Sequence, residues 1–174
     1  MFFFAYRIVF SWAWKRKIEK MLRCYLTYIM NPEMSKTYED GSLYQGKILN
    51  NRRNGHGTLN FKMYDRPCIY IGGWKDDQYH GYADFIHWKP FGEKILKVHY
   101  IGEMRHGEAN GQGTLTWVDD DIRVIGYWTD SNCLHGKIIT KTSSYFGDIG
   151  ENRYPHGFGK ITSTDGTVTE GDFF

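Results

Sequence analysis

Large apolar residues and small or polar residues alternate with a period of two over most of the chain. In residues 70–74, Tyr70, Gly72 and Trp74 fall at every second position. In an extended strand, this spacing places all three on one face of the sheet. Residues 113–117 alternate in the same way, with a glycine followed by leucine and tryptophan. The pattern therefore predicts paired β-strands in this part of the chain.

The strand pattern repeats. An aromatic or β-branched residue, a free position and a glycine recur along the chain, and the copy at residues 100–117 is the most regular. The first glycines of five copies and a terminal half copy are Gly46, Gly72, Gly102, Gly126, Gly147 and Gly171. A period this short holds one β-hairpin per repeat. Because glycine weakens a strand, we predict a structural role in which a neighbouring aromatic ring lies over its backbone.

These copies resemble the MORN repeat (membrane occupation and recognition nexus), whose unit runs roughly Tyr-x-Gly-x-Trp-x-x-Gly-x-x-x-Gly-x-Gly. The resemblance covers about residues 44–174. Some positions depart from the pattern: the turn glycine is replaced by Asn51, Asp77, Ser131 and Asn152, and the final glycine by Ala83 and Ile138. The resemblance implies an all-β fold, a single-layer sheet of antiparallel hairpins curved into an open trough and used mainly for binding and scaffolding.

Turn signals add detail to the array. The Asp-Gly pairs within residues 39–42 and 164–167 predict tight turns in which positive φ is required. The interval between Gly72 and Gly102 is the longest, and it contains Trp88-Lys89-Pro90-Phe91-Gly92-Glu93-Lys94. We interpret this stretch as an extended hairpin loop that projects from the array.

Before the array, the composition changes. Residues 1–35 are predicted to form a basic, aromatic-rich helical leader, and residues 38–174 the array of about five hairpins plus a terminal half repeat. Apolar residues recur at helical spacing between Ile18 and Ile29, which predicts an amphipathic helix over about residues 15–30. Asn31-Pro32-Glu33 interrupts it, because a residue before proline disfavours helical geometry.

Charge divides along the same boundary. The net charge of the chain is +2, but residues 1–30 carry +5 and the remainder −3. The apolar run from Phe2 to Trp14 is too short to span a membrane, and its positive charge follows the run where a secretory signal would have it first. A membrane-surface anchor, a helix packed on the array or on a partner, mitochondrial import and disorder remain open. For the anchor, the lipid-binding residues are Arg7, Trp12, Trp14, Lys15, Arg16, Lys17, Lys20 and Arg23.

The sequence offers little chemistry. Cys24, Cys68 and Cys133 lie far apart in the sequence without paired spacing, which favours reduced thiols over a disulfide or a zinc site. Asp119-Asp120-Asp121 lacks the alternation of carboxylates that a calcium loop has. His80, His135 and His156 each precede a glycine, and residue counting places them at the same position of the repeat. A repeated position favours a structural role. No histidine is paired with a nucleophile and a carboxylate, no phosphate-binding loop occurs, and the acidic array disfavours nucleic acid. We expect no catalytic residue, no metal site and no cofactor.

One face of the sheet should carry a row of rings along the trough. The predicted partner-binding residues are Tyr44, Tyr70, Trp74, Tyr100, Trp117, Trp128 and Tyr145. The alternative is that these rings only pack the array. The leading hypothesis is a non-catalytic scaffold or adaptor that binds a helix or extended peptide of another protein. A peripheral membrane tether is the competing one. The unpaired cysteines favour a cytoplasmic location, and the resemblance implies an association with the cytoskeleton, a cilium or a membrane. The oligomeric state stays open, since residues 169–173 end the array on a strand edge.

Overall fold

The computed structural model describes residues 34–150 and 154–174. The predicted leader helix and the eight proposed lipid-binding residues lie outside the described residues. Within the described residues every regular element is a strand: β1 (Met34–Thr37), β2 (Leu43–Leu49), β3 (Arg52–Met63), β4 (Arg66–Lys75), β5 (Gln78–Phe91), β6 (Lys94–Arg105), β7 (Glu108–Trp117), β8 (Ile122–Thr129), β9 (Asn132–Ile139), β10 (Ser143–Ile149), β11 (Pro155–Ser163) and β12 (Val168–Phe173). This part of the chain holds no helix with the length and apolar character needed to cross a membrane.

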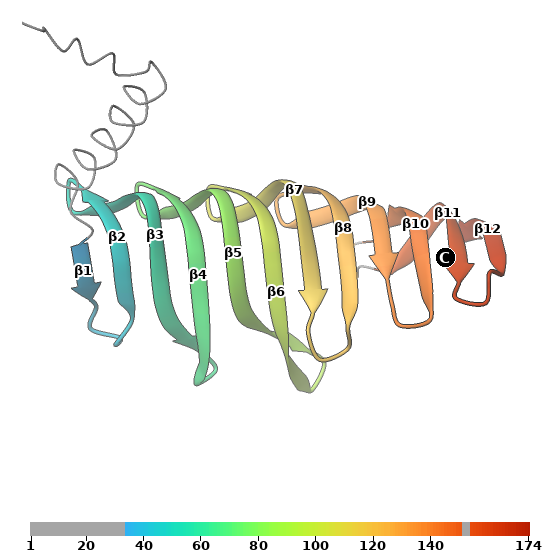
Figure 1. The fold of residues 1–174 in the computed structure, drawn as a ribbon, viewed down its shortest axis with the longest axis horizontal. Coiled ribbons are helices and arrows are strands. Elements are labelled where there is room, and N and C mark those ends of the chain that lie inside the picture. Colours follow the sequence, from blue (N-terminus) through green and yellow to red (C-terminus); the bar gives the residue numbers. More distant parts are fainter. Residues whose placement is uncertain (1–33, 151–153) are drawn as a thin grey trace, which may run out of the picture. The chain divides into compact units, whose positions relative to one another are not determined.

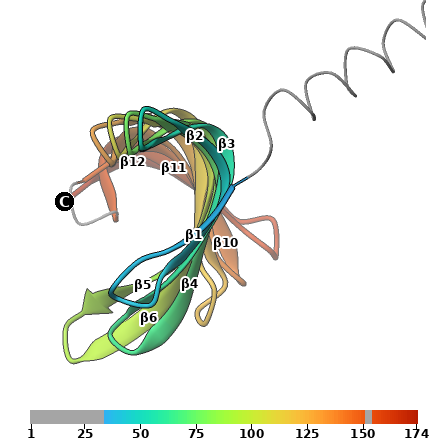
Figure 2. The same ribbon diagram turned by 90° about the vertical axis from the view of Figure 1, so that its left-hand side faces the viewer.

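The strands form one antiparallel sheet in which each strand pairs with its neighbours in the chain, from β1 to β12 (Figure 1). The predicted all-β hairpin array is therefore confirmed, and β1 and β12 are the edge strands of the described sheet. The sheet begins at Met34, four residues before the array start expected from the sequence. Seen along its length, the sheet curves into an open trough (Figure 2).

A row of glycines crosses the middle of the sheet. Cross-strand pairing joins Gly46, Gly57, Gly72, Ala83, Gly102, Gly113, Gly126, Gly136, Gly147, Gly159 and Gly171 in one line over eleven strands. A Cβ atom on Gly46 would lie 2.6 Å from the Tyr44 hydroxyl, and one on Gly113 would lie 2.7 Å from Cζ of Tyr100. At both positions a tyrosine side chain occupies the space that another side chain would need.

The pairing corrects the alignment of one repeat. Counting residues put Ile138 in place of a final glycine. In the structure, Gly136 pairs with Gly126 and Gly147, whereas Ile138 pairs with Val124 and Tyr145. The assignment of Ile138 is therefore wrong. The cause is a bulge in β9 that takes up one residue fewer than the bulges of the other repeats.

The hairpin of each of the five repeats carries one register shift, directly after the first glycine of that repeat. In the first, Gly46 pairs with Gly57 and Ile48 with Arg53, so Lys47 faces three residues of β3. Bulges of this kind bend and twist a strand, and repeated on the same edge they produce the curve of the trough. The tyrosine hydroxyl of the repeat holds the bend: Tyr44 donates to the Lys47 carbonyl at 2.9 Å. Tyr70, Tyr100 and Tyr145 donate in the same way to Gly73, Glu103 and Asp148.

Turns within the repeats use two residues of positive φ, as in Asn50-Asn51 and Asp76-Asp77. Their φ values, 50° and 63° in the first turn, match the type I′ geometry that fits the twist of a hairpin. Asp77 and Ser131, which replace the expected turn glycine, adopt φ of 69° and 64°. The Asp-Gly turns are also as predicted, with Gly41 and Gly166 at φ 79° and 87°.

The projecting hairpin predicted around residues 88–94 is present, but as strand and not as loop. β5 continues to Phe91 and β6 begins at Lys94, with Gly92 and Glu93 in the turn. Pro90 pairs with Ile95 near this end, so the ladder runs almost to the tip.

Candidate binding groove

The floor of the groove is the row next to the glycines on the concave face. It runs Tyr44, Leu59, Tyr70, Phe85, Tyr100, Leu115, Val124, Ile138, Tyr145 and Ile161, so that aromatic and aliphatic residues adjoin across the strands. Most of these side chains are buried and belong to one hydrophobic cluster. The floor is thus continuous from β2 to β11.

Aromatic contacts join the first repeat to the second and the third repeat to the fourth. The ring of Tyr44 meets Trp74 of the following repeat edge-on, with centroids 5.4 Å apart, and Tyr100 meets Trp128 at 5.7 Å. The indole Nε1 of Trp74 donates to the Gly57 carbonyl at 3.2 Å, and that of Trp128 to the Gly113 carbonyl at 3.0 Å. The tryptophans therefore hold neighbouring hairpins together.

The seven predicted partner-binding residues all lie on this face, but six of them have little free surface. Tyr44, Tyr70, Trp74, Tyr100, Trp128 and Tyr145 are at most 3% exposed. Trp117 alone is half-buried. A partner-binding role for these rings stays a prediction, and their burial agrees with the alternative that they pack the array. A change of Trp74 or Trp128 to alanine would remove an interior ring, at a cost of about 3–5 kcal/mol, and would not isolate binding.

Burial also affects the ionisation of tyrosines in the floor and beside it. Burial raises the pKa of Tyr70, Tyr79 and Tyr145, and it raises that of Tyr100 with help from the nearby Glu103 carboxylate. These hydroxyls remain neutral donors at physiological pH.

The surface open to a partner is made by residues beside those rings. Phe61, Phe85, Trp117, Ile122 and Ile161 are half-buried against the cluster. Two hollows lie over the floor, with volumes of about 180 and 190 Å³. The first is lined by residues of β5–β11, and the second mainly by residues of β5–β8. The alternation of the sequence assigns all these residues to the concave face, but their partial exposure depends on the curvature of the sheet.

Reactive side chains do not gather in the groove. In the described part of the chain, no three His, Cys, Asp or Glu side chains are close enough to hold a metal ion. Cys68 and Cys133 are free and buried, and burial raises the pKa of the Cys68 thiol; Cys24 lies outside the described residues. His135 pairs with Asp148 at 2.8 Å on the outer face. It does not share the repeat position of His80 and His156, because Gly136 lies in the glycine row.

An open sheet of β-hairpin repeats with an apolar concave face defines a class of repeat proteins. The family model of the MORN repeat matches residues 44–66, 70–86, 100–122 and 154–168. The chain is a MORN-repeat protein. Proteins of this family are generally non-enzymatic, and their repeats commonly mediate contacts with proteins or membranes. In a comparison with curated proteins, no match to the chain was found.

Proposed function

We propose that this protein is a non-catalytic scaffold or adaptor whose concave groove binds a helix or extended peptide of another protein. The observation that supports the proposal is the combination of a continuous apolar floor with two hollows that the chain's own side chains leave unfilled. Concave apolar surfaces edged by polar residues are typical of binding sites. A cytoplasmic location at the cytoskeleton, a cilium or a membrane is part of the same proposal.

The groove can be tested with two positions of one strand. Ile122 and Ile125 both lie in β8, but Ile122 lines the first hollow, whereas Ile125 is 38% exposed on the outer face. A photo-crosslinking amino acid placed at either position in the full chain samples one face of the same sheet in the cell. We expect protein adducts from position 122 that are absent from position 125.

The captured protein is then purified and its affinity is measured. Ile122→Lys should weaken its binding, because the lysine places a charge on the apolar floor, while Ile125→Lys should not. Thermal melts of both variants check that the sheet remains folded. Identical adducts from the two positions, or adducts only from position 125, would contradict binding in the groove.

A second candidate function, peripheral membrane tethering, is favoured by the charge of +5 over residues 1–30. Each basic residue near an anionic surface contributes about 1 kcal/mol. Flotation of the full chain with vesicles that contain phosphatidylserine should be reduced when Lys15, Arg16 and Lys17 are changed to glutamine. Unchanged flotation, or none with either protein, would exclude the tether.

A further inference from the structure

One hairpin is longer than its neighbours and borders the first hollow. Phe91 lies eight positions beyond Ala83 of the glycine row, whereas Trp117 lies four positions beyond Gly113. Relative to the β7–β8 hairpin, four more residues of strand extend this hairpin by about 13 Å. We call its outer part, residues 88–96, the lip. Figure 2 shows the β5–β6 hairpin curving toward the open side of the trough.

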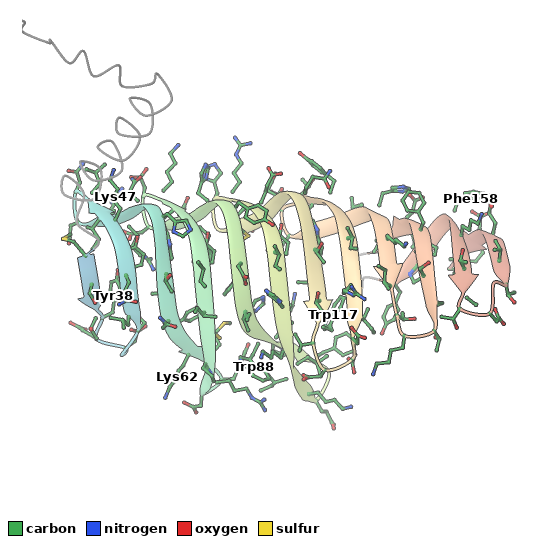
Figure 3. All side chains as sticks on the ribbon, in the orientation of Figure 1. Tyr38, Lys47, Lys62, Trp88, Trp117 and Phe158 are labelled. Atoms are coloured by element: carbon green, nitrogen blue, oxygen red, sulfur yellow. The ribbon has the colours of Figure 1, made fainter. Side chains whose placement is uncertain are left out.

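The lip is braced against the sheet. Nε1 of Trp88 donates to the Pro67 carbonyl at 3.0 Å, and the guanidinium of Arg66 lies 4.4 Å from the centre of the Trp88 ring. Trp88 and Trp117 both lie toward the same rim of the sheet (Figure 3). A cation held over an aromatic ring adds to the stability of such a contact. The lip is therefore a fixed wall of the groove.

Phe91 and Leu96 of the lip line the first hollow together with residues of β7 to β11. Its floor and far wall include Trp117, Ile122, Ile138, Tyr145 and Ile161. The volume of about 180 Å³ suits one large side chain, since an apolar cavity of about 150 Å³ takes up benzene. Phe91 is 51% exposed, so much of its ring is available for contact.

The polar groups at this hollow are few, and one of them is charged. Thr140 and Ser143 bond to each other at 3.1 Å. Asp119, next to the hollow, accepts the backbone N–H of Lys97 at 3.2 Å. Asp120 lines the hollow, and no described residue donates a hydrogen bond or an ion pair to its carboxylate. The hollow is an apolar site with one available negative charge at its edge.

We propose that this hollow is an anchor subsite for a basic partner segment. One bulky apolar side chain of the partner enters between the lip and β7–β11, and a neighbouring lysine or arginine pairs with Asp120. The inference rests on the proposed function, which it makes more specific. The second hollow differs, because no carboxylate of the described residues lines it.

The test selects binding peptides from a phage-displayed library of random linear sequences, with the full chain as bait. Peptides selected by the wild type should carry a bulky apolar residue close to a lysine or arginine. Asp120→Lys should weaken the best of them about tenfold, and Phe91→Ala should do the same. In a fresh selection with Asp120→Lys as bait, the selected peptides should carry aspartate or glutamate in place of the basic residue.

Matched controls lie on the outer face. Asp172→Lys changes an exposed carboxylate and Phe146→Ala an exposed ring, 57% accessible, and neither should alter the affinity of the selected peptides. All four variants change exposed side chains, so a comparable melting temperature is expected for each.

Three results would overturn the subsite. They are selected peptides without basic residues, equal affinity of these peptides for the wild type and Asp120→Lys, and a fluorescent fatty acid that fills the hollow of the wild type and binds Asp120→Lys with the same affinity. If the selected peptides depend on Ile122 but not on Asp120 or Phe91, the subsite fails and groove binding stands. If they are also insensitive to Ile122→Lys, the proposed function fails with it.

Discussion

At the scale of single residues, the fold depends on pairs of a tyrosine and a glycine. Tyr100 covers Gly113 of the paired strand, and its hydroxyl reaches the Glu103 carbonyl at 2.9 Å. The ring thus fills the space of a missing side chain on the paired strand. Its hydroxyl also stabilises the bulge in its own strand. Tyr44 with Gly57 and Tyr145 with Gly159 repeat the arrangement. The glycine in a strand interior is required here by the ring and not by its own dihedral angles.

Gly113→Ala tests this pair, because intrinsic preference and packing act in opposite directions. In an ordinary strand, alanine is favoured over glycine by roughly 0.5–1 kcal/mol. Here the new methyl group would lie 2.7 Å from Cζ of Tyr100. We expect a loss of about 2–3 kcal/mol in the free energy of unfolding, measured by urea denaturation.

A second background identifies the cause of that loss. In Tyr100→Leu, where the ring is absent, Gly113→Ala should cost less than about 1 kcal/mol. An equal cost in both backgrounds would show that the ring does not determine the glycine.

Much of the tyrosine–glycine arrangement could be predicted from the sequence, since period-two spacing already places tyrosine and glycine on one face. The burial of the rings could not be. Tyr44 is covered by Trp74, a residue thirty positions away, and the edge-on contact exists only because the sheet curves. For the same reason, Phe91 and Ile122 could not be singled out as accessible groove residues.

At the scale of elements, the turns connect one hairpin to the preceding one. The backbone N–H of Asp77 donates to the Arg53 carbonyl at 3.1 Å, and Gly107 and Ser131 donate in the same way to Tyr79 and Ala109. Where the turn glycine is replaced, the new side chain adds an acceptor. The Asp77 carboxylate takes the Arg53 backbone N–H at 2.9 Å and its Nε at 3.0 Å. The departures from the repeat pattern therefore strengthen the connection.

Asp77→Asn removes the charge from this connection and keeps a residue type that tolerates positive φ. Burial acts to raise the pKa of Asp77, but the hydrogen bonds and the charge of Arg53 outweigh it and hold the pKa below its ordinary value of 3.8. Because the folded-state pKa is depressed, the stabilisation is present above that value and is lost as the pH falls through the folded pKa.

Urea denaturation should show that Asp77→Asn is less stable than the wild type at neutral pH by about 0.5–1 kcal/mol, a small value because the carboxylate is 42% exposed. The difference should shrink toward zero below about pH 3.8. A difference that is constant with pH would contradict an electrostatic origin.

Element boundaries were partly accessible to sequence reasoning. The positions of the turns and the long hairpin could be predicted from Asp-Gly pairs and from the wide spacing around Trp88. The register of β9 could not be predicted, because the alternation of apolar and polar residues does not determine how many residues a bulge contains. Leu134 and His135 fill a bulge that holds three residues in the other repeats, and this shifts Gly136 into the glycine row.

At the scale of the whole sheet, the array behaves as a line of contacts, since each hairpin touches mainly the hairpins before and after it. The floor row joins each hairpin to the next, and edge-on aromatic pairs such as Tyr44–Trp74 strengthen some of these junctions. A change in the tyrosines of that row therefore acts on the cohesion of the array. High pH is such a change, because it ionises tyrosine in the unfolded chain before it ionises the buried rings.

Tyr70 and Tyr100 should make the sheet unfold at high pH. Burial raises the pKa of both, whereas an unfolded tyrosine ionises near pH 10. The stabilisation by each ring is thus complete below about pH 10 and declines above it, by about 1.4 kcal/mol per pH unit and per tyrosine. We expect urea midpoints to fall steeply above pH 10, with near-ultraviolet circular dichroism lost as phenolate absorbance appears.

Tyr100→Phe separates the two effects of this hydroxyl. It deletes the hydrogen bond to Glu103, which should lower stability at neutral pH by about 1 kcal/mol. It also deletes one ionisable group, which should make the alkaline slope shallower by about 1.4 kcal/mol per pH unit. The stability curves of the variant and the wild type should then cross roughly one pH unit above the ordinary tyrosine pKa. Parallel curves would mean that the buried ring at position 100 ionises as easily in the folded sheet as in the unfolded chain.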